Sequence, residues 1–440
     1  MALPSARVAG CSDPRLVLGR TIVTGYSVRI LPSSMSAVSA SASASASALV
    51  KRHLSSSTNV DPTANTHSRP KKLGILMMNM GGPRTQSDVE QFLVNIFNDR
   101  DILTLPLQSI VGRFIALRRV GKVKDQYMQI GGGSPIEMWT RTQGKGMVDI
   151  LDRTSPETGP HKYYVGFRYT NPDTVEAVEQ MLSDGIEHVI AFSQYQQYSG
   201  STTGSNLNEL YRVQKRLDPG SRLQWSFIDR WGTHPKLVES FADRIEDQIK
   251  RLTSDVRHTT PILFSAHSLP LNVVDRGDPY VAEVGGTVAY VVEELRRRGI
   301  NNPYRLVWQS AVGPLRWLGP QTEDAIKSYG SAGYTSLVMV PIAFTSDHIE
   351  TLFELDIEYG EVAEESGITQ FLRAEALNDH PPFIDTLATI VKEHIDAGFP
   401  TNSQLLLPDP GKESEQTRTT RQWIAMQGQR LATAAGSKAP

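Results

Sequence analysis

The chain has 440 residues, enough for two α/β lobes, and a formal net charge of −2. The first 72 residues contain nine Lys or Arg and two Asp, so residues 73–440 have a net charge of about −9, which argues against nucleic acid as the main partner. The single cysteine, Cys11, excludes a disulfide and a Cys-ligated metal or iron–sulfur cluster.

Residues 1–72 are predicted to be a mitochondrial transit peptide. They are Arg-bearing, Ser-rich and acid-poor and include the run SASASASA, a composition typical of import leaders. Cleavage is expected between about Lys51 and Lys72, and a disordered tail is the alternative. The chain contains no run of 18 apolar residues, so we expect no bilayer-spanning segment and only peripheral membrane association.

Short apolar runs of strand length recur between residues 73 and 344, and a polar turn follows each of them. The runs are LGILMMNM, KYYVGFRY, HVIAFSQY, QWSFIDRW, PILFSAHS, YRLVWQS and SLVMVPIAF. Helical patterns such as HPKLVESFADRIEDQIKRL and VAYVVEELRRRG lie between them. This alternation predicts an α/β fold of βαβ units with parallel sheets covered by helices on both faces.

Two such lobes account for the length. The first lobe is expected over residues 73–180 and the second over residues 181–400, closing with a helix near residues 382–397. Residues 401–440 are expected to form a polar, mobile tail.

A hydrophobic lip at residues 89–119 interrupts the first lobe. It combines large apolar side chains with a basic end at Arg118 and Arg119. One interpretation is a helical hairpin packed on the lobe. The other is an apolar surface that dips into a membrane and offers Arg to a ligand carboxylate.

Parallel sheets bind ligands beyond the carboxyl ends of their strands, so the residues at those ends are the candidate site. They are rich in Tyr, Trp, Met, Arg and His, which favours a large flat ligand over a nucleotide. GSTTGS, at residues 200–205, lacks the spacing and the lysine of a phosphate-binding loop. HIE, at residues 348–350, lacks the two cysteines of a zinc deaminase.

His267 stands at a predicted strand end in FSAHSLP, between two serines. A lone histidine is often a hydrogen-bonded core residue, but the strand end and the turn-forming Pro270 favour a functional one.

An acidic segment, FTSDHIETLFELDIEYGEVAEE at residues 344–365, follows the last apolar run. At 100° per residue, Glu350, Glu354 and Glu358 fall about 40° apart, with Ile349, Leu352, Phe353 and Ile357 roughly opposite. An acidic face of this kind is usually a solvated surface. A partly buried one would have raised pKa values and could pass protons or hold a hydrated cation.

These strings together resemble the ferrochelatases, almost continuously from LGILMMNMGGP to RAEALNDHPPF at residues 373–383. The resemblance implies two Rossmann-like lobes and an enzyme that inserts ferrous iron into protoporphyrin IX, the last step of haem synthesis. It also implies the matrix side of the mitochondrial inner membrane. Fe²⁺ would be a substrate, with no permanently bound cofactor and no nucleic acid partner.

The resemblance assigns roles to individual residues. By motif, contacts to the macrocycle are expected from Met80, Arg119, Tyr127, Ser134, Arg168, Tyr169 and Trp317. His267 is the expected base for the pyrrole protons, because imidazole titrates near neutrality. The resemblance expects catalytic assistance from Glu350, Asp347, His348 and, as a weaker candidate, His234. It places the path of metal and protons along His267, Glu350, Glu354 and Glu358. The three glutamates of this path lie on a helix that the resemblance implies is locally π-wound.

The chain departs from the family pattern where some members ligate a [2Fe-2S] cluster. Gly200 occupies the internal cysteine position and no cysteine follows Thr401, so no cluster is expected. A homodimer held by an ordered C-terminal extension is correspondingly less supported. Two alternatives stay open: a coproporphyrin chelatase, and a non-catalytic porphyrin or haem carrier that would need neither His267 nor the acidic segment.

Overall fold

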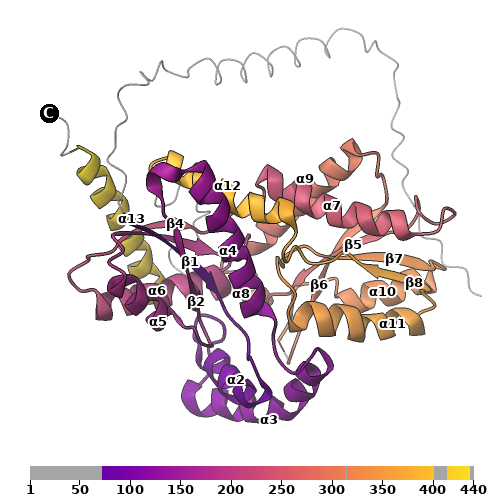
Figure 1. The fold of residues 1–440 in the computed structure, drawn as a ribbon. Coiled ribbons are helices and arrows are strands. Elements are labelled where there is room, and N and C mark those ends of the chain that lie inside the picture. Colours follow the sequence, from indigo (N-terminus) through magenta and orange to yellow (C-terminus); the bar gives the residue numbers. More distant parts are fainter. Residues whose placement is uncertain (1–71, 314, 401–413, 437–440) are drawn as a thin grey trace, which may run out of the picture. The chain divides into compact units, whose positions relative to one another are not determined.

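The structure is a computed structural model that describes residues 72–313, 315–400 and 414–436. The predicted leader lies outside these ranges except for Lys72. Two four-stranded parallel sheets form the centre of the described part (Figure 1). The first has the strand order β2-β1-β3-β4 and the second β6-β5-β7-β8. The strands are β1 (Leu73–Asn79), β2 (Lys162–Phe167), β3 (His188–Ser193), β4 (Gln224–Ile228), β5 (Ile262–His267), β6 (Tyr304–Gln309), β7 (Ser336–Pro341) and β8 (Gln370–Arg373).

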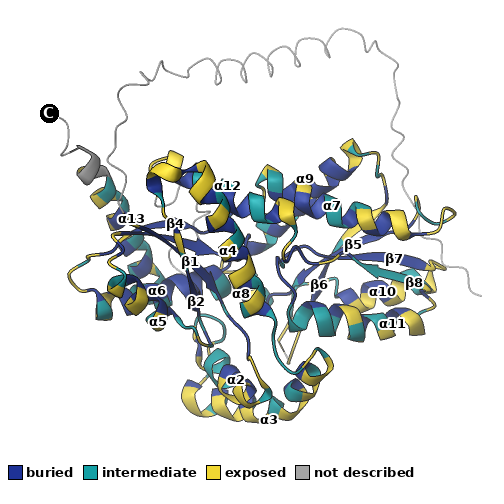
Figure 2. Ribbon diagram, in the orientation of Figure 1, coloured by how far each residue is buried: buried dark blue, intermediate teal, exposed yellow. Residues whose placement is uncertain are grey.

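All seven predicted strands are confirmed, and the expected parallel pairing is present in both sheets. Strand β8 was not predicted. It has four residues, all of them half-buried, so it carries neither the length nor the apolar run that marks the other strands. Figure 2 shows the remaining strands as the most buried layer of the fold.

The predicted boundary between the lobes, near residue 180, is wrong. β3 pairs with β1, and β4 pairs with β3, so both belong to the first sheet. The chain reaches the second sheet only at β5, after the helix α7 (Pro235–Arg251). Sequence spacing did not reveal this, because β3 and β4 look like the strands on either side of them.

Helices cover both sheets. They are α2 (Val89–Asn98), α3 (Gln108–Gln129), α4 (Ile136–Thr154), α5 (Thr174–Ser183), α6 (Ser205–Leu217), α7 (Pro235–Arg251), α8 (Leu271–Val274), α9 (Tyr280–Arg297), α10 (Thr322–Ser331), α11 (Tyr359–Glu365), α12 (Pro381–Asp396) and α13 (Glu415–Gly436). Two short 3₁₀ helices are η1 (Gln86–Asp88) and η2 (Pro156–Thr158), and two π-helices are η3 (Gly200–Gly204) and η4 (Glu350–Glu358).

The predicted closing helix is confirmed as α12. Its apolar face, with Phe383 and Leu387, joins a core cluster that contains residues of both sheets, such as Ile190 and Phe264. A buried amide adds a direct link, since Gln196 Nε2 donates to the carbonyl of Ile342 at 2.9 Å. The two lobes therefore share one continuous core, which holds their strand ends in a fixed relation.

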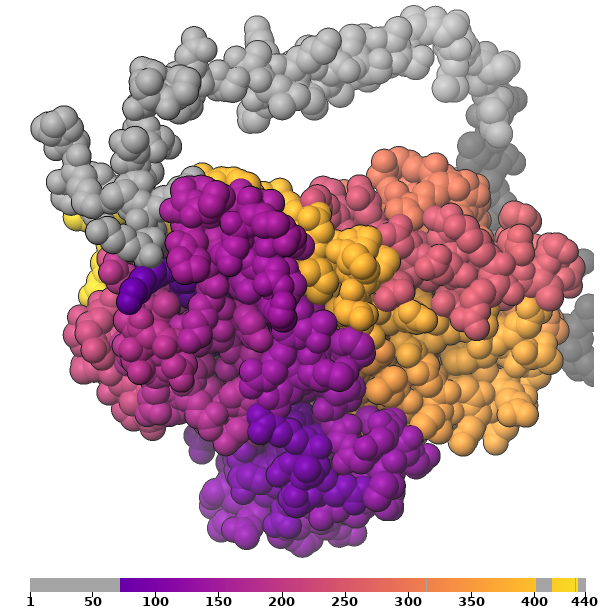
Figure 3. Space-filling model, in the orientation of Figure 1, coloured from indigo at the N-terminus to yellow at the C-terminus, as the bar shows by residue number. Residues whose placement is uncertain are grey.

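The hydrophobic lip folds as the α2–α3 hairpin, so the hairpin interpretation is confirmed. Phe92 and Leu93 pack inward with Val123 and Tyr127, while Ile110 and Phe114 on α3 remain 67% and 59% exposed. Figure 3 shows the hairpin protruding as a separate mass at the bottom of the view. A packed inner side does not account for the apolar outer side, which is taken up below.

The C-terminal segment is not simply a polar mobile tail. Residues 415–436 form the helix α13, and Trp423 is 4% exposed in a cluster with Trp225, Phe227 and Tyr211. The helix pattern was weak because Trp423, Ile424 and Met426 are grouped within one turn of an otherwise mostly polar segment and form no repeating apolar face. Docking of that side chain onto β4 and α6 supplies the stabilisation that the local sequence lacks.

Two buried histidines make stability depend on pH. His188 and His394 both lie next to the ring of Phe399, and burial lowers the pKa of each to about 3. In the unfolded chain each would titrate near 6.5, so between about pH 6.5 and 3 the unfolded state binds more protons. Their contribution to stability is therefore complete above pH 6.5 and is lost as the pH falls toward 3.

We expect the double variant His188→Gln, His394→Gln to flatten the fall in unfolding free energy between pH 6.5 and 5. The slope should decrease by about 1.4 kcal/mol per pH unit for each histidine removed. Urea unfolding at several pH values measures it, with the exposed His258→Gln as a control that should keep the wild-type slope. A double variant with the wild-type slope would contradict the assignment to this pair.

Candidate active site

His267 ends β5, and the parallel register places it beside Gln309 at the end of β6. Its Nδ1 lies 2.6 Å from the carbonyl oxygen of Ser268, so that nitrogen must carry the proton and donate. Nε2 is therefore the basic nitrogen, and it lies 4.0 Å from Glu350 Oε1. The side chain of His267 is 37% exposed, so a ligand can reach Nε2.

Glu350 stands between two histidines. Its Oε1 faces His267 and its Oε2 lies 3.6 Å from Nε2 of His348. Burial acts to raise the pKa of Glu350, but the two histidines outweigh it and hold that pKa below its usual range. The carboxylate is thus ionised at neutral pH and stabilises a positive charge on either ring.

The acidic segment is π-wound over Glu350–Glu358, as the resemblance implied. Its carboxylates run from the interior to the surface, because Glu350 and Glu354 are half-buried and Glu358 is exposed. The apolar face differs from the one that α-helical spacing predicted. Thr351 and Leu355 are the fully buried positions, since the wider π-turn changes which side chains share a face.

Glu354 is the most strongly hydrogen-bonded carboxylate of the segment. It accepts from the backbone N–H of Ser310 at 2.8 Å and its Oγ at 2.5 Å, from Gln309 Nε2 at 3.1 Å and from the Tyr359 hydroxyl at 3.0 Å. Burial and the charge of Glu350 raise its pKa. Glu354 can therefore take up a proton more readily than an ordinary carboxylate, directly behind Glu350.

Asp347 has both carboxylate oxygens engaged. Oδ1 accepts from Arg373 at 3.1 Å and from the Thr351 hydroxyl at 2.8 Å, while Oδ2 accepts from Asn378 Nδ2 at 2.7 Å. Thr351 is the second residue of the π-helix, so its hydrogen bond to Asp347 fixes where that helix starts. The structure gives Asp347 an orienting position and not a free base.

A tryptophan and a tyrosine lie near the histidine–carboxylate pair. The ring of Trp317 lies 6.3 Å from that of His267, and Met80 packs in the same cluster as Tyr127, in the last turn of α3. Burial, and then the charge of Glu350, raises the pKa of Tyr127 above its usual range, so it stays protonated. Ser134 packs against Gly82, where an added Cβ would lie 2.6 Å from the Ser134 Oγ.

Three more predicted contact residues lie on or next to the α2–α3 hairpin. Arg119, on the α2–α3 hairpin, has its guanidinium 5.8 Å from the Phe97 ring centroid. Arg168 and Tyr169 follow β2 and are bonded to Asp99. These two side chains are thus directed to the base of the hairpin.

His234 does not join the site. It precedes α7 and its Nε2 lies 3.2 Å from Glu393 on α12. Within the ranges that the structure describes, no three His, Cys, Asp or Glu side chains are grouped so as to hold a metal ion. The four predicted metal residues therefore form a succession rather than a ready-made cage.

Sequence reasoning missed several residues of this arrangement. Tyr195 and Tyr280 are buried, and the charge of Glu350 contributes, after burial, to raising the pKa of both. Tyr195 belongs to no motif that marks it as functional. In the structure its hydroxyl accepts from the backbone N–H of Met80 at 3.0 Å. Gln309 and Ser310 closed a predicted strand, and that position was the available signal.

Fold and site together define a class of protein: an α/β protein of two parallel-sheet lobes whose candidate site joins a histidine to a row of carboxylates beside a tryptophan. The family model described as Ferrochelatase matches residues 72–395. "Ferrochelatase, mitochondrial" of Bos taurus is 51% identical over 83% of this chain and 88% of its own length, and that of Gallus gallus is 53% identical over 79% and 86%. SirB from Bacillus subtilis with Fe³⁺ overlaps at a TM-score of 0.46 and 11% identity, covering 75% of this chain and 99% of its own.

The chain belongs to the ferrochelatase family. Members of this family insert iron into protoporphyrin in haem synthesis, and that activity is the function of this chain. The names of the relatives support a mitochondrial location.

The Asp347 contacts predict a stability difference between two carboxylates that share Arg373. Asp347→Asn should lower the unfolding free energy by about 3 kcal/mol, because the amide would turn its N–H₂ group toward one of the buried donors of Arg373, Thr351 and Asn378. Asp356→Asn should cost less than about 1 kcal/mol, because Asp356 pairs with the same arginine on the exposed side of the segment. Urea unfolding of both variants measures this, and equal losses would contradict it.

Proposed function

We propose that this chain inserts ferrous iron into protoporphyrin IX with His267 as the base, on the matrix side of the mitochondrial inner membrane. The observation that carries the proposal is the pairing of His267 Nε2 with Glu350 at 4.0 Å, next to Trp317. Such a pair serves a reaction in which a base must accept protons beside a flat apolar ring.

The chemistry replaces two pyrrole N–H protons by one Fe²⁺. His267 Nε2 accepts a proton from a pyrrole nitrogen, whose lone pair then binds the incoming ion. The imidazolium that forms is stabilised by the ionised carboxylate of Glu350, which faces it. Since the charge develops only when the proton moves, this interaction favours the transition state over the bound substrate.

The departing protons have a route in the acidic segment. Glu354 stands next along the π-helix with a raised pKa, and Glu358 is exposed. A proton passed from the His267–Glu350 pair to Glu354 would therefore be close to water.

Protoporphyrin is favoured over coproporphyrin by charge. Two propionates need few cationic partners, and Arg119 and Ser134 are the polar groups that motif assigns to them. A macrocycle with four carboxylates would need more. A non-catalytic carrier is disfavoured, because binding alone requires neither the basic Nε2 nor an ionised carboxylate beside it. No iron–sulfur cluster is expected, because the full sequence has one cysteine.

The test is metal insertion into protoporphyrin IX by the purified protein, followed by loss of porphyrin fluorescence with Fe²⁺ or Zn²⁺ and without ATP. Removing the base in His267→Ala should reduce kcat by at least about 100-fold, while porphyrin binding, measured by tryptophan quenching, is retained. His234→Ala is the control and should keep more than half of the activity, since His234 lies with Glu393. Equal rates of metal insertion in wild type and His267→Ala would contradict the assignment of His267 as the base.

Peripheral membrane association is the second part of the proposal. Leu107, Ile110, Phe114 and Leu117 recur three or four residues apart and are 44% to 73% exposed. Arg113 and Arg118 are exposed beside them. Apolar side chains flanked by cations are typical of helices that lie in the interface of an anionic membrane. Among the described residues, the helices are too short or too polar to cross a bilayer.

The double variant Ile110→Asp, Phe114→Asp should bind vesicles of phosphatidylcholine and phosphatidylglycerol at least about tenfold more weakly, because two apolar side chains no longer enter the lipid. Cosedimentation measures the partition. Tyr290→Asp changes an aromatic side chain that is 58% exposed on α9 and should bind like wild type. Undiminished binding by the double variant would assign the membrane contact elsewhere.

A further inference from the structure

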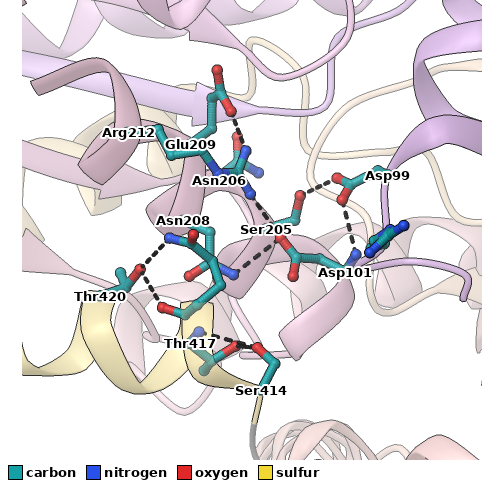
Figure 4. A network of polar contacts seen from close by, with 12 residues as sticks. Asp99, Asp101, Ser205, Asn206, Asn208, Glu209, Arg212, Ser414, Thr417 and Thr420 are labelled. Carbon is teal, nitrogen blue, oxygen red and sulfur yellow. Dashed lines mark hydrogen bonds and ion pairs between the residues drawn. The ribbon is translucent and has the colours of Figure 1, made fainter. Parts of the chain in front are cut away.

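Asp99, the residue after α2, is a buried junction between the α2–α3 hairpin and the first lobe (Figure 4). Its Oδ2 accepts from the Tyr169 hydroxyl at 2.6 Å and from the Ser205 hydroxyl at 2.5 Å, and it lies 3.1 Å from Arg168 Nη2. Its side chain is 3% exposed. One carboxylate oxygen thus holds three donors, two from the end of β2 and one from the start of α6.

The carboxylate of Asp99 is ionised. Burial acts to raise its pKa, but the charge of Arg168 and the hydrogen bonds from Ser205 and Tyr169 outweigh burial and lower it. A charge-assisted bond is stronger than a neutral one, and here it is shielded from water. The junction therefore resists opening more than a surface ion pair would.

Arg168 is occupied within this junction. Besides Asp99, it donates from Nε to Ser205 at 3.1 Å, lies 3.7 Å from Glu209, and stacks over the Tyr169 ring at 5.1 Å. Its side chain is 15% exposed. The N–H groups of the guanidinium are therefore largely engaged by these partners and are not free to bind a propionate, although the resemblance assigns Arg168 to the macrocycle.

The hairpin is rigid beyond the junction. Gln108 Nε2 donates to the carbonyls of Phe97 and Leu103, and its Oε1 accepts from Leu105 N–H, so the linker between the helices is closed on itself. Gly112 lets α3 approach α2, since a Cβ there would lie 2.5 Å from the Phe97 oxygen. Any movement at Asp99 would accordingly carry the whole hairpin.

We propose that Asp99 is a positioning residue for porphyrin binding. Through Arg168, Tyr169 and Ser205 it holds the α2–α3 hairpin so that Arg119 and Tyr127 meet the macrocycle in register with His267. Arg168 and Tyr169 act through this junction and do not touch the macrocycle. The inference rests on the proposed function and adds a determinant of porphyrin affinity to it.

Asp99→Asn tests the junction. The variant should raise both KM and Kd for protoporphyrin by about ten- to a hundredfold, the range of a lost charge-assisted hydrogen bond. KM for Zn²⁺ should stay within about twofold. Asp125→Asn is the matched control on the same hairpin, because Asp125 is an exposed residue of α3 away from the junction. The control should leave both porphyrin constants within about twofold of wild type.

Hydrogen exchange provides a readout that does not depend on catalysis. In Asp99→Asn, amides of residues 89–129 should exchange faster while those of β1 stay protected. If the variant does not fold, Ser205→Ala and Tyr169→Phe each remove one donor and should still raise porphyrin Kd about two- to fivefold. Unchanged porphyrin Kd in the folded Asp99→Asn, or in both single-donor variants, overturns the proposal, as does an equal effect of Asp125→Asn.

A double variant tests whether Arg168 acts through Asp99 or contacts the macrocycle directly. If Arg168 acts through Asp99, adding Arg168→Gln to Asp99→Asn causes no further loss of porphyrin affinity. A further loss of about tenfold would place Arg168 on the macrocycle and overturn that part. If wild type binds porphyrin but inserts no metal, the proposed function fails while the Asp99 effect on Kd still stands or falls separately.

Discussion

The pairing of His267 with a carboxylate that burial alone would have neutralised is the interaction on which the proposed site depends. Glu350 keeps its charge only because His267 and His348 lie on either side of it. The same arrangement fixes what each group can do. His267 is held by Ser268 through Nδ1, so that Nε2 faces both the carboxylate and the space for a substrate. A base whose protonated form is already compensated needs no rearrangement when the proton arrives.

The π-helix makes this pairing possible without placing all the acids in the same environment. Glu350 and Glu354 interact by charge, yet the first has a lowered and the second a raised pKa. The difference arises because histidines face Glu350, whereas neutral donors from Ser310 and Tyr359 face Glu354. Neighbouring carboxylates whose pKa values are shifted in opposite directions can take different roles: one stabilises a positive charge and the other accepts protons.

Sequence patterns predicted those features that depend on local order. Seven strands were readable because each is an apolar run, and His267 was singled out by the rule that parallel strands present ligands at their carboxyl ends. That His267 lies beside Gln309 became known only from the strand register. Strand β8 and α13 were not, since each depends on packing against a distant element. The α-helical spacing of the acidic segment also gave the wrong buried face, because a π-turn is set by tertiary contacts such as Asp347 with Asn378.

The role of Asp99 was the feature that sequence patterns were least able to predict. Its partners are separated from it by 70 residues at Tyr169 and by 106 at Ser205, and nothing in the sequence around it marks a site. The roles of Arg168 and Tyr169 followed from motif, which identifies residues a family shares but not what they touch. Their burial against Asp99 gives a physical reason for the same residue types: in the proposed arrangement, an arginine and a tyrosine at that strand end hold the helices that would contact the macrocycle.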